Sequence, residues 1–315
     1  MASLAPASFG AALTAAHDAS GAQHYPQGTL YVVATPIGNL ADITLRALHV
    51  LQLVDTLACE DTRHTQSLLR AYGIDRPNAR LLAVHQHNEA EAAQGVIARL
   101  VQGERIAYVS DAGTPGVSDP GARLVAAVRS AGLRVLPLPG ASSVTTLIGA
   151  AGLVAEGGDG SAASAFVFAG FLPSKAGERD AAVQGLAQEP RAVVVLEAPH
   201  RIEALARALA VLGERRVTVG RELTKQFEEI ATVPAAALPD WFAADRDRTR
   251  GEFALVLHPV AVDDGGAAEG ERVLRLLLAE LPVKTAVKLA AEISGAPRNA
   301  LYETALRMRK DAGDD

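Results

Sequence analysis

Polar and glycine-rich segments follow several short apolar runs in this chain of 315 residues, and their side chains are of types that do chemistry. The longest is V-S-D-A-G-T-P-G-V-S-D-P-G at residues 109–121. Its glycines allow close backbone approach and positive φ angles, its prolines stiffen the loop, and a helix after it would offer unpaired N–H groups. An ordinary connection needs fewer turn-forming residues, so we favour a loop that grips a small ligand.

The segment L-P-G-A-S-S-V at residues 138–144 repeats this arrangement, with a glycine and two hydroxyl groups directly after an apolar run. Ser142 or Ser143 could either cap the following helix or contact a ligand. Capping is the simpler role for a single serine.

The segment E-D-T-R-H-T at residues 60–65 places two carboxylates, an arginine and a histidine at the end of one apolar run. Such a set can orient a polar substrate and transfer protons. Alternatively, Asp61 or Thr62 caps a helix while Arg63 and His64 are solvated. The residues themselves favour neither interpretation.

Three further motifs are weaker. His85 and His87 in H-Q-H-N-E have the spacing of two metal ligands, but no third ligand is identifiable, so polar groups at a helix start are the better interpretation. Charged residues also follow apolar runs in E-A-P-H-R at residues 197–201 and G-R-E-L-T-K at residues 220–225. Surface ion pairs would explain both.

Short apolar runs that alternate with amphipathic stretches indicate an α/β fold with mostly parallel strands. Open sheets of this kind bind ligands at the carboxyl ends of their strands, where the polar segments lie. A first block has expected strands at residues 29–34, 56–59, 81–84 and 105–110, and a second block has them at 166–173, 192–200, 216–223 and 252–259. Glycine-rich linkers are expected at 152–164 and 260–271.

The last part of the chain is predicted to be helical. Two helices around Gly295 and Pro297 are typical of a helix-turn-helix. Residues 269–310 hold eight Lys or Arg against five Glu, whereas the whole chain has a formal net charge of -6. The organisation expected is a disordered tail at 1–27, α/β domains at 28–151 and 165–260, and a helical domain at 269–315.

Composition limits the possible functions. The acidic balance argues against a protein that holds polyanions by bulk charge, and 4% aromatic residues leave few platforms for base stacking. A single cysteine, Cys59, excludes an intramolecular disulfide. No basic residue precedes Arg46 and no apolar run approaches a membrane span, so we expect a cytoplasmic protein without a membrane partner. The sequence lacks the glycine-rich motifs that bind a nucleoside triphosphate or a dinucleotide, and the motif that carries a serine nucleophile. A kinase, a dinucleotide oxidoreductase and a serine hydrolase are therefore disfavoured.

The motifs together resemble a known family. L-Y-V-V-A-T-P-I-G-N-L-A-D-I-T-L-R-A-L at 30–48, C-E-D-T-R-H-T at 59–65, the loop at 109–121, L-P-G-A-S-S at 138–143 and G-R-E-L-T-K are similar to the ribosomal RNA small subunit methyltransferase I family. This resemblance runs in order over roughly residues 28–310. It implies two α/β domains of the tetrapyrrole methylase type with the cofactor cleft between them, plus a small C-terminal helical domain.

The resemblance also implies an activity: S-adenosyl-L-methionine-dependent methylation of the ribose 2'-hydroxyl of a cytidine in the decoding region of small-subunit (16S) ribosomal RNA. The substrate would be the RNA or the assembled small subunit, and the enzyme a homodimer. Residues implied to bind the cofactor are Pro36, Asp111, Gly113, Thr114, Val117, Ser142, Ser143, Glu197, Ala198, Gly251 and Glu252. Ala141 and Leu196 depart from the family's usual proline and aromatic residue.

A catalytic set follows as a hypothesis. Glu60 or Asp61 would polarise the hydroxyl, and Arg63 and His64 beside them would contact the RNA backbone. The residues expected to contact RNA are Asn88, Arg221 and Lys225 in the α/β domains and Lys284, Lys288 and Arg298 in the helical domain. Two alternatives remain: a methyltransferase of the same fold that acts on a tetrapyrrole or another small molecule, and a non-catalytic RNA-binding assembly factor.

Overall fold

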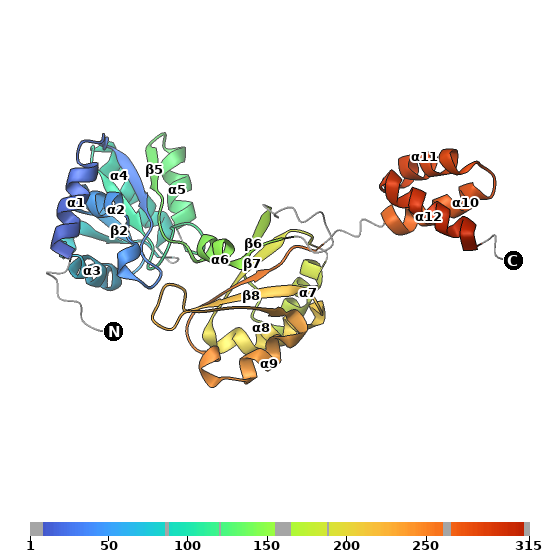
Figure 1. Ribbon diagram of the computed structural model, residues 1–315. Coiled ribbons are helices and arrows are strands. Elements are labelled where there is room, and N and C mark those ends of the chain that lie inside the picture. Colours follow the sequence, from blue (N-terminus) through green and yellow to red (C-terminus); the bar gives the residue numbers. More distant parts are fainter. Residues whose placement is uncertain are drawn as a thin grey trace. The chain divides into compact units, whose positions relative to one another are not determined.

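The computed structural model describes residues 9–85, 88–119, 121–154, 165–187, 189–260 and 266–311. Contacts divide these residues into an α/β unit that extends to Pro259 and a helical unit at the C-terminal end. The α/β unit contains two five-stranded sheets, which we call the first and the second half (Figure 1). Short 3-10 helices accompany the main elements at Leu40–Asp42, Asn78–Arg80, Pro199–Arg201, Ala210–Leu212, Ala235–Ala237 and Arg246–Thr249.

The sheet of the first half is parallel throughout, with strand order β3-β2-β4-β1-β5. Its strands are β1 (Thr29–Val33), β2 (Thr56–Cys59), β3 (Leu81–Ala83), β4 (Ile106–Val109) and β5 (Arg134–Leu138). The inner strands β2 and β4 are buried along their whole length, because helices cover both faces. All carboxyl ends therefore meet at one edge, as the sequence predicts for this half.

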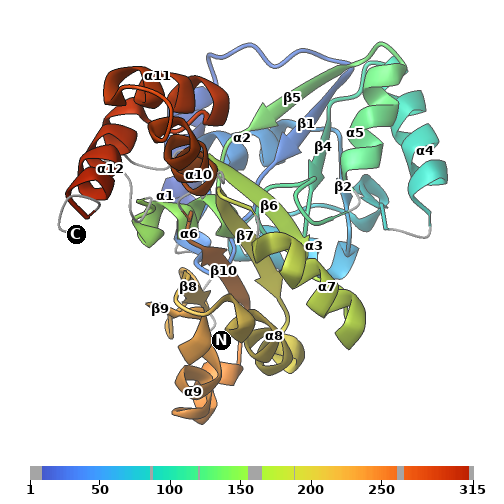
Figure 2. The same ribbon diagram turned by 90° about the vertical axis from the view of Figure 1, so that its right-hand side faces the viewer.

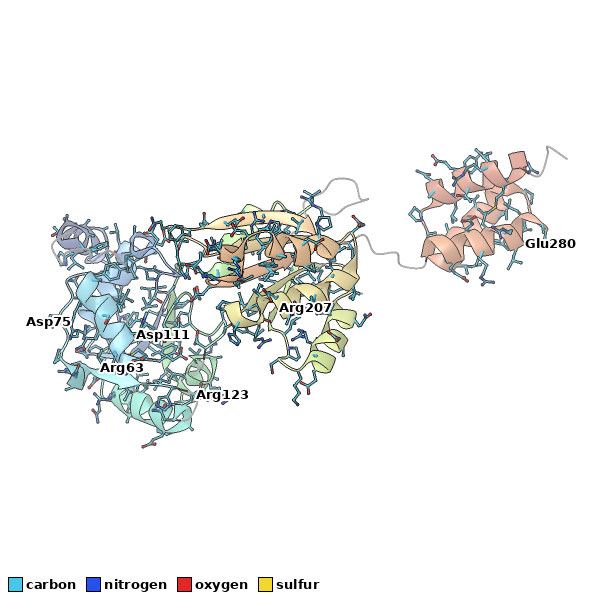
Figure 3. All side chains as sticks on the ribbon, turned by 90° about the horizontal axis from the view of Figure 1, so that it is seen from below. Arg63, Asp75, Asp111, Arg123, Arg207 and Glu280 are labelled. Carbon is cyan, nitrogen blue, oxygen red and sulfur yellow. The ribbon has the colours of Figure 1, made fainter. Side chains whose placement is uncertain are left out.

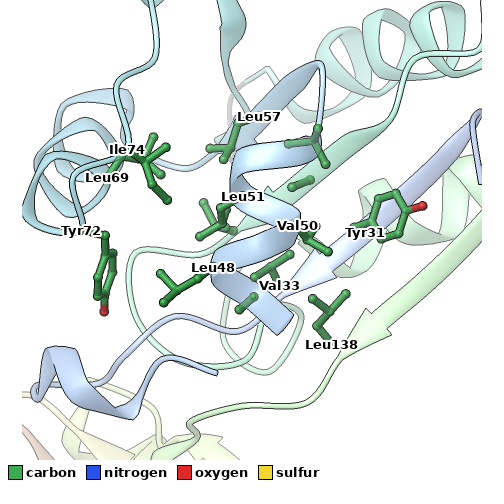
Figure 4. Packing of buried hydrophobic residues seen from close by; sticks show 14 of the residues in the cluster. Tyr31, Val33, Leu48, Val50, Leu51, Leu57, Leu69, Tyr72, Ile74 and Leu138 are labelled. Carbon is green, nitrogen blue, oxygen red and sulfur yellow. The ribbon is translucent and has the colours of Figure 1, made fainter. Parts of the chain in front are cut away.

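Helices pack on the two faces of this sheet through separate apolar clusters. They are α1 (Gly10–Ser20), α2 (Leu45–Leu53), α3 (Thr62–Ala71), α4 (Glu89–Val101) and α5 (Gly121–Ser130). On one face, Leu48 and Leu51 of α2 lie over Val33 and Leu57 (Figure 4). On the other face, α4 and α5 cover Leu30 and Tyr108.

The expectation of a disordered tail at residues 1–27 is wrong for the part that the structure describes. Residues 10–20 form α1, and Ala16 is fully buried against the first core. Phe9, Ala12, Leu13 and Ala16 follow helical spacing and all pack on that core. This apolar stripe is short and half of it is alanine, which explains why it is easily overlooked in the sequence. Residues 1–8 lie outside the described part.

The second sheet is mixed, so the expectation of mostly parallel strands does not hold for this half. Its order is β6-β7-β10-β8-β9, and only β6 runs parallel to β7. The strands are β6 (Phe166–Phe171), β7 (Ala192–Glu197), β8 (Arg216–Arg221), β9 (Glu229–Pro234) and β10 (Phe253–Leu257). Strand β9 is not among the strands expected from the sequence, and its residues alternate between half-buried and exposed at the sheet edge.

One face of the second sheet carries α7 (Ala176–Ala187), α8 (Ile202–Leu209) and α9 (Leu238–Ala243) (Figure 2). The other face receives α6 (Ser143–Ala151), which follows β5 of the first sheet. Val144 and Leu147 of α6 pack against Val194 and Val256. Helix α6 therefore joins the two halves through a shared apolar cluster.

The helical unit has a core of its own. It consists of α10 (Gly266–Leu278), α11 (Val283–Ser294) and α12 (Arg298–Asp311). Leu274, Val287 and Leu301, one from each helix, are buried together. Gly295 ends α11 with a φ of 75°, a conformation that favours glycine. Within the described residues, no helix is long and apolar enough to cross a membrane.

Candidate active site

A cavity of about 160 Å³ lies at the carboxyl ends of the strands of the first sheet. Each loop that forms it follows a different strand, and because β2, β4, β1 and β5 are neighbours, their loops converge. One residue, Leu196 at the end of β7, comes from the second half. The lining residues are Ile37, Glu60, Ser110, Asp111, Ala112, Gly113, Thr114, Val117, Ser118, Asp119, Ser142, Ser143 and Leu196.

The loop after β4 is joined to the loop after β1. Thr35 and Gly113 exchange both backbone hydrogen bonds, at 2.9 and 3.0 Å. Gly113 has a φ of 83°, and a Cβ there would lie 3.3 Å from Cγ2 of Ile37. The position therefore favours glycine both by conformation and by space. The backbone can then lie against the cavity without a side chain in between.

Asp119 holds the end of the same loop in place. Its carboxylate accepts the backbone N–H of Gly116 at 2.8 Å and that of Gly121 at 2.8 Å, and it also accepts the hydroxyl of Tyr108 at 3.2 Å. In the part of this loop that the structure describes, a buried tyrosine and a carboxylate thus fix the start of α5.

Glu60 and Asp61 are adjacent in sequence but differ in environment. Asp61 is the N-cap of α3 and accepts the backbone N–H of Arg63 at 2.8 Å, while its other oxygen pairs with the Arg63 guanidinium at 3.1 Å. These hydrogen bonds lower the pKa of Asp61. Glu60 instead lines the cavity. Partial burial, followed by the charges of Asp111 and Asp119, raises the pKa of Glu60.

The N-terminus of α6 faces the cavity through Ser142 and Ser143. Ser142 is the N-cap residue, yet it makes no side-chain capping hydrogen bond. The simpler role expected for a serine here is therefore not the one it has. Thr114 donates its hydroxyl to the carbonyl of Ala141 at 3.0 Å and so connects this loop to the loop after β4.

Sequence comparison with known proteins identifies the family to which the chain is similar. The sequence pattern of the tetrapyrrole (corrin/porphyrin) methylases matches residues 29–239, and that of the RsmI C-terminal HTH domain matches residues 264–309. The chain is 48% identical to ribosomal RNA small subunit methyltransferase I of Escherichia coli O157:H7, over 90% of this chain and 96% of that protein. The protein of the same name from Pseudomonas aeruginosa is 47% identical over 90% and 98%.

The chain belongs to the ribosomal RNA small subunit methyltransferase I family. The fold agrees with this membership. A cobalt precorrin-4 methyltransferase covers 74% of this chain and 98% of its own length at 17% identity, with a TM-score of 0.51. Diphthine synthase covers 73% and 90% at 12% identity, with a TM-score of 0.50. The tetrapyrrole methylase fold and the helical C-terminal domain expected from the sequence are thus confirmed.

In this member of the methyltransferase I family, many of the residues expected to bind a cofactor converge. Asp111, Gly113, Thr114, Val117, Ser142 and Ser143 all line the cavity, and Glu60 lies among them. Lining residues that the sequence analysis missed are Ile37, Ser110, Ala112, Ser118 and Asp119. All five lie within or next to the quoted motifs. Membership of a motif, and not the residue type, could therefore have identified them as lining residues.

The remaining cofactor residues named from the resemblance lie outside the lining of the cavity. Pro36 is buried beside Ile37. Glu197 is buried, accepts the backbone N–H of Ala198 at 2.9 Å and pairs with Arg201 at 3.1 Å. Its neighbour Leu196 lines the cavity instead. Gly251 and Glu252 directly precede β10.

The residues expected to contact RNA fall into two groups. Asn88, Arg221 and Lys225 are engaged within the protein: Asn88 with the backbone around Ala83, Arg221 with two carbonyls, and Lys225 with Glu222 and Glu252. Arg63, His64 and the helical residues Lys284, Lys288 and Arg298 are exposed. Figure 3 shows Arg63 and Asp111 in the first half, together with Arg123 at the start of α5. His87 of the H-Q-H-N-E motif lies outside the described residues.

Proposed function

We propose that this protein uses S-adenosyl-L-methionine to methylate the ribose 2'-hydroxyl of a cytidine in the decoding region of small-subunit ribosomal RNA. The observation that carries the proposal is the convergence of four strand-end loops on one cavity, with Glu60 beside the residues expected to hold the cofactor. Relatives that are nearly half identical bear the name of a methyltransferase of this RNA.

The lining residues fit a cofactor with a positively charged sulfonium centre. Three acidic residues, Glu60, Asp111 and Asp119, line the cavity. Gly113 lets the backbone approach a ligand closely, and Ser142 at the start of α6 leaves its hydroxyl uninvolved in capping. Asp111, Gly113, Thr114, Ser142 and Ser143 would hold the cofactor. When bound, it would supply an already activated methyl group.

The protein then has two tasks, to orient the ribose hydroxyl and to take its proton. We assign removal of the proton to Glu60 and not to Asp61, the other carboxylate expected to act on the hydroxyl. Asp61 is occupied as a helix cap, whereas Glu60 lines the cavity and has a raised pKa. A carboxylate with a raised pKa is a better proton acceptor than an ordinary one. Glu60 would take the proton of the hydroxyl as the oxygen bonds to the methyl carbon. The bond from that carbon to the sulfonium sulfur would break at the same time, and its electron pair would stay on the sulfur, which becomes neutral.

RNA would be recognised outside the cavity. Arg63 is 90% exposed at the start of α3, close in sequence to Glu60. The helical unit offers Lys284, Lys288 and Arg298 on its surface. Such side chains contact phosphates without reading sequence. A substrate as small as a tetrapyrrole would not need them, which favours RNA over the small-molecule alternative.

The proposal is tested by methyl transfer from labelled cofactor to small subunits that lack the modification, and in parallel to protein-free RNA. We expect label on one cytidine, in its ribose, after nucleoside mapping. Label on a base would contradict the 2'-O-specificity. Cofactor binding without any transfer to either substrate would favour a small-molecule enzyme, and no cofactor binding would favour an assembly factor. The homodimer that the resemblance implies is tested by sedimentation of the protein alone, which measures its molecular mass in solution.

A further inference from the structure

Phe227 is an unusually exposed aromatic residue in a chain with few aromatics. Its exposed fraction is 68%, against 43% for Phe166, 52% for Phe171 and 41% for Tyr302. It lies in the connection between β8 and β9, residues 222–228. An apolar ring of this size is stabilised when another surface covers it. The exposure of the Phe227 ring therefore needs an explanation in the structure of this loop and of its surroundings.

The backbone of this connection is strained. Glu222 and Thr224 have φ angles of 51° and 67°, and they are the non-glycine residues with positive φ in the described part of the chain. For a β-branched residue such as Thr224 this conformation is rare. Strain of this kind costs free energy and gathers at ligand clamps and active sites. It persists only where neighbouring groups enforce it.

Side chains enforce the conformation from several directions. The Glu222 carboxylate accepts Nζ of Lys225 at 2.8 Å and the backbone N–H of Glu252 at 2.9 Å. The backbone N–H of Thr224 donates to Glu228 at 2.6 Å. Arg221 donates from Nη1 to the carbonyl of Phe227 itself, at 3.1 Å. These contacts hold the backbone at Phe227, so little ordering of the loop would remain to be done when the ring is covered.

The same loop adjoins the wall of the cavity. The backbone N–H of Asn39 donates to Oγ1 of Thr224 at 3.1 Å, so the loop after β1 and the β8–β9 connection are in direct contact (Figure 1). Two residues earlier, Ile37 lines the cavity. Phe227 does not line the cavity, and so it stands outside it on an adjoining loop.

We propose that Phe227 stacks on an unpaired nucleobase of the RNA substrate, close to the ribose that is methylated. This rests on the proposed function. Proteins that recognise single-stranded RNA stack splayed bases on aromatic rings, and stacking needs no positive charge. That last property fits the surroundings, because Glu228 follows Phe227 directly and is exposed.

The test compares Phe227→Ala, Phe227→Trp and a control, Phe171→Ala, which removes an exposed phenylalanine from β6. We expect Phe227→Ala to weaken binding of unmodified small subunits about 5- to 150-fold, the range for loss of one stacked base. Phe227→Trp should keep wild-type affinity. Binding of S-adenosyl-L-methionine and the unfolding midpoint should be the same in all variants, because the ring is exposed and outside the cavity.

Phe227→Trp also reports on the contact directly. The chain has one tryptophan, Trp241, so Phe227→Trp in a Trp241→Phe background places a single fluorophore on the loop. Addition of unmodified small subunits should quench its fluorescence, because a stacked base lies against the indole. The matched variant Phe171→Trp, in the same Trp241→Phe background, should show no quenching.

Several outcomes would overturn the inference. Equal affinity of wild type and Phe227→Ala for RNA, with wild type active, would defeat it while leaving the proposed function intact. Weaker cofactor binding by Phe227→Ala would assign the ring to the cofactor site. A lower molecular mass of Phe227→Ala in solution would assign it to contact between two copies of the chain. A wild type that neither binds nor methylates small subunits would defeat the proposed function first and this inference with it.

Discussion

The backbone N–H of Asn39 lies 3.1 Å from Oγ1 of Thr224, to which it donates a hydrogen bond. This bond joins the loop after the first strand of one sheet to the strained connection of the other. Beside it, a Cβ on Gly38 would collide with the Cγ of Lys225 and would lie 3.0 Å from Oγ1 of Thr224. The two halves of the α/β unit therefore approach each other here as closely as a glycine permits.

Gly38→Ala should consequently destabilise the α/β unit. The added methyl group would force the two loops apart, and overpacking of this kind typically costs about 1–3 kcal/mol. The matched control is Gly95→Ala in α4, where a Cβ would meet nothing within 4 Å. That change should be neutral or stabilising by up to about 1 kcal/mol, because alanine is the better helix former. Thermal unfolding of both variants decides between these expectations; equal midpoints would show that the loops adjust freely.

Glu60→Gln should lower single-turnover methyl transfer about 10²- to 10⁴-fold, the usual contribution of a general base. Cofactor affinity should change much less. Asp61→Asn, which keeps an oxygen for the helix cap, is the matched neighbour and should retain turnover. Full activity of Glu60→Gln would remove the proposed proton acceptor.

The pH dependence of the same step follows from the charges around Glu60. A base must be deprotonated, so activity should fall as pH decreases through the pKa of Glu60, which burial and Asp111 raise above its usual value. Asp111→Asn removes a like charge and should move this acid limb to lower pH. A limb that does not move would mean that another group titrates.

Ionisation of Glu60 should lower the free energy of unfolding. Because its pKa is higher in the folded protein than in the unfolded chain, the ionised form opposes folding. This penalty is present above the folded pKa and disappears as pH falls below the unfolded value. Glu60→Gln should therefore raise the unfolding midpoint at neutral pH but not at pH 3. A lower midpoint at neutral pH would show that the carboxylate forms stabilising bonds.

The helical unit should contribute to RNA affinity through charge. Replacing Lys284, Lys288 and Arg298 by alanine should weaken RNA binding and reduce the slope of log affinity against log salt by about 2–3, if each cation contacts one phosphate. The control replaces Arg272 and Arg275, which pair with Glu269 and Glu271 at 2.7 and 3.5 Å. These contacts are closer than the 3.9 Å between Lys288 and Glu292, so the control should have a smaller effect.

A truncation after Val260 removes the helical unit altogether. Since that unit has a separate core, the α/β unit should remain folded and bind the cofactor with unchanged affinity, while RNA affinity falls. Circular dichroism and calorimetry check the first two points. RNA affinity equal to that of the full chain would show that the α/β unit holds the substrate alone.

Much of the cavity could be predicted because its parts are continuous in sequence. The loop at residues 109–121 carries its glycines, prolines and aspartates in one stretch, and the parallel order of the first sheet brings it next to Glu60 and Ser142. The contribution of Leu196 could not be predicted in this way. It depends on how the second half packs, which no local pattern encodes.

Other features depended on tertiary contacts that override local signals. Asp61 and Glu60 are equivalent as residue types, and only the position of the α3 N-terminus separates a cap from a cavity carboxylate. The strain at Thr224 is imposed by Glu228 and by the approach of Asn39, since threonine by itself disfavours that conformation. Lys225 and Arg221 look like free cations in sequence but are used to hold this loop.

The position of β10 has a consequence for how the chain is made. This strand lies in the middle of the second sheet, between β7 and β8, although it is the last of the sheet's strands in the sequence. During synthesis, β7 and β8 therefore each expose an open edge until residues 253–257 have emerged. A ribosome that stalls before this point would release a chain that cannot close its second sheet, and such fragments should be recognised by chaperones and proteases.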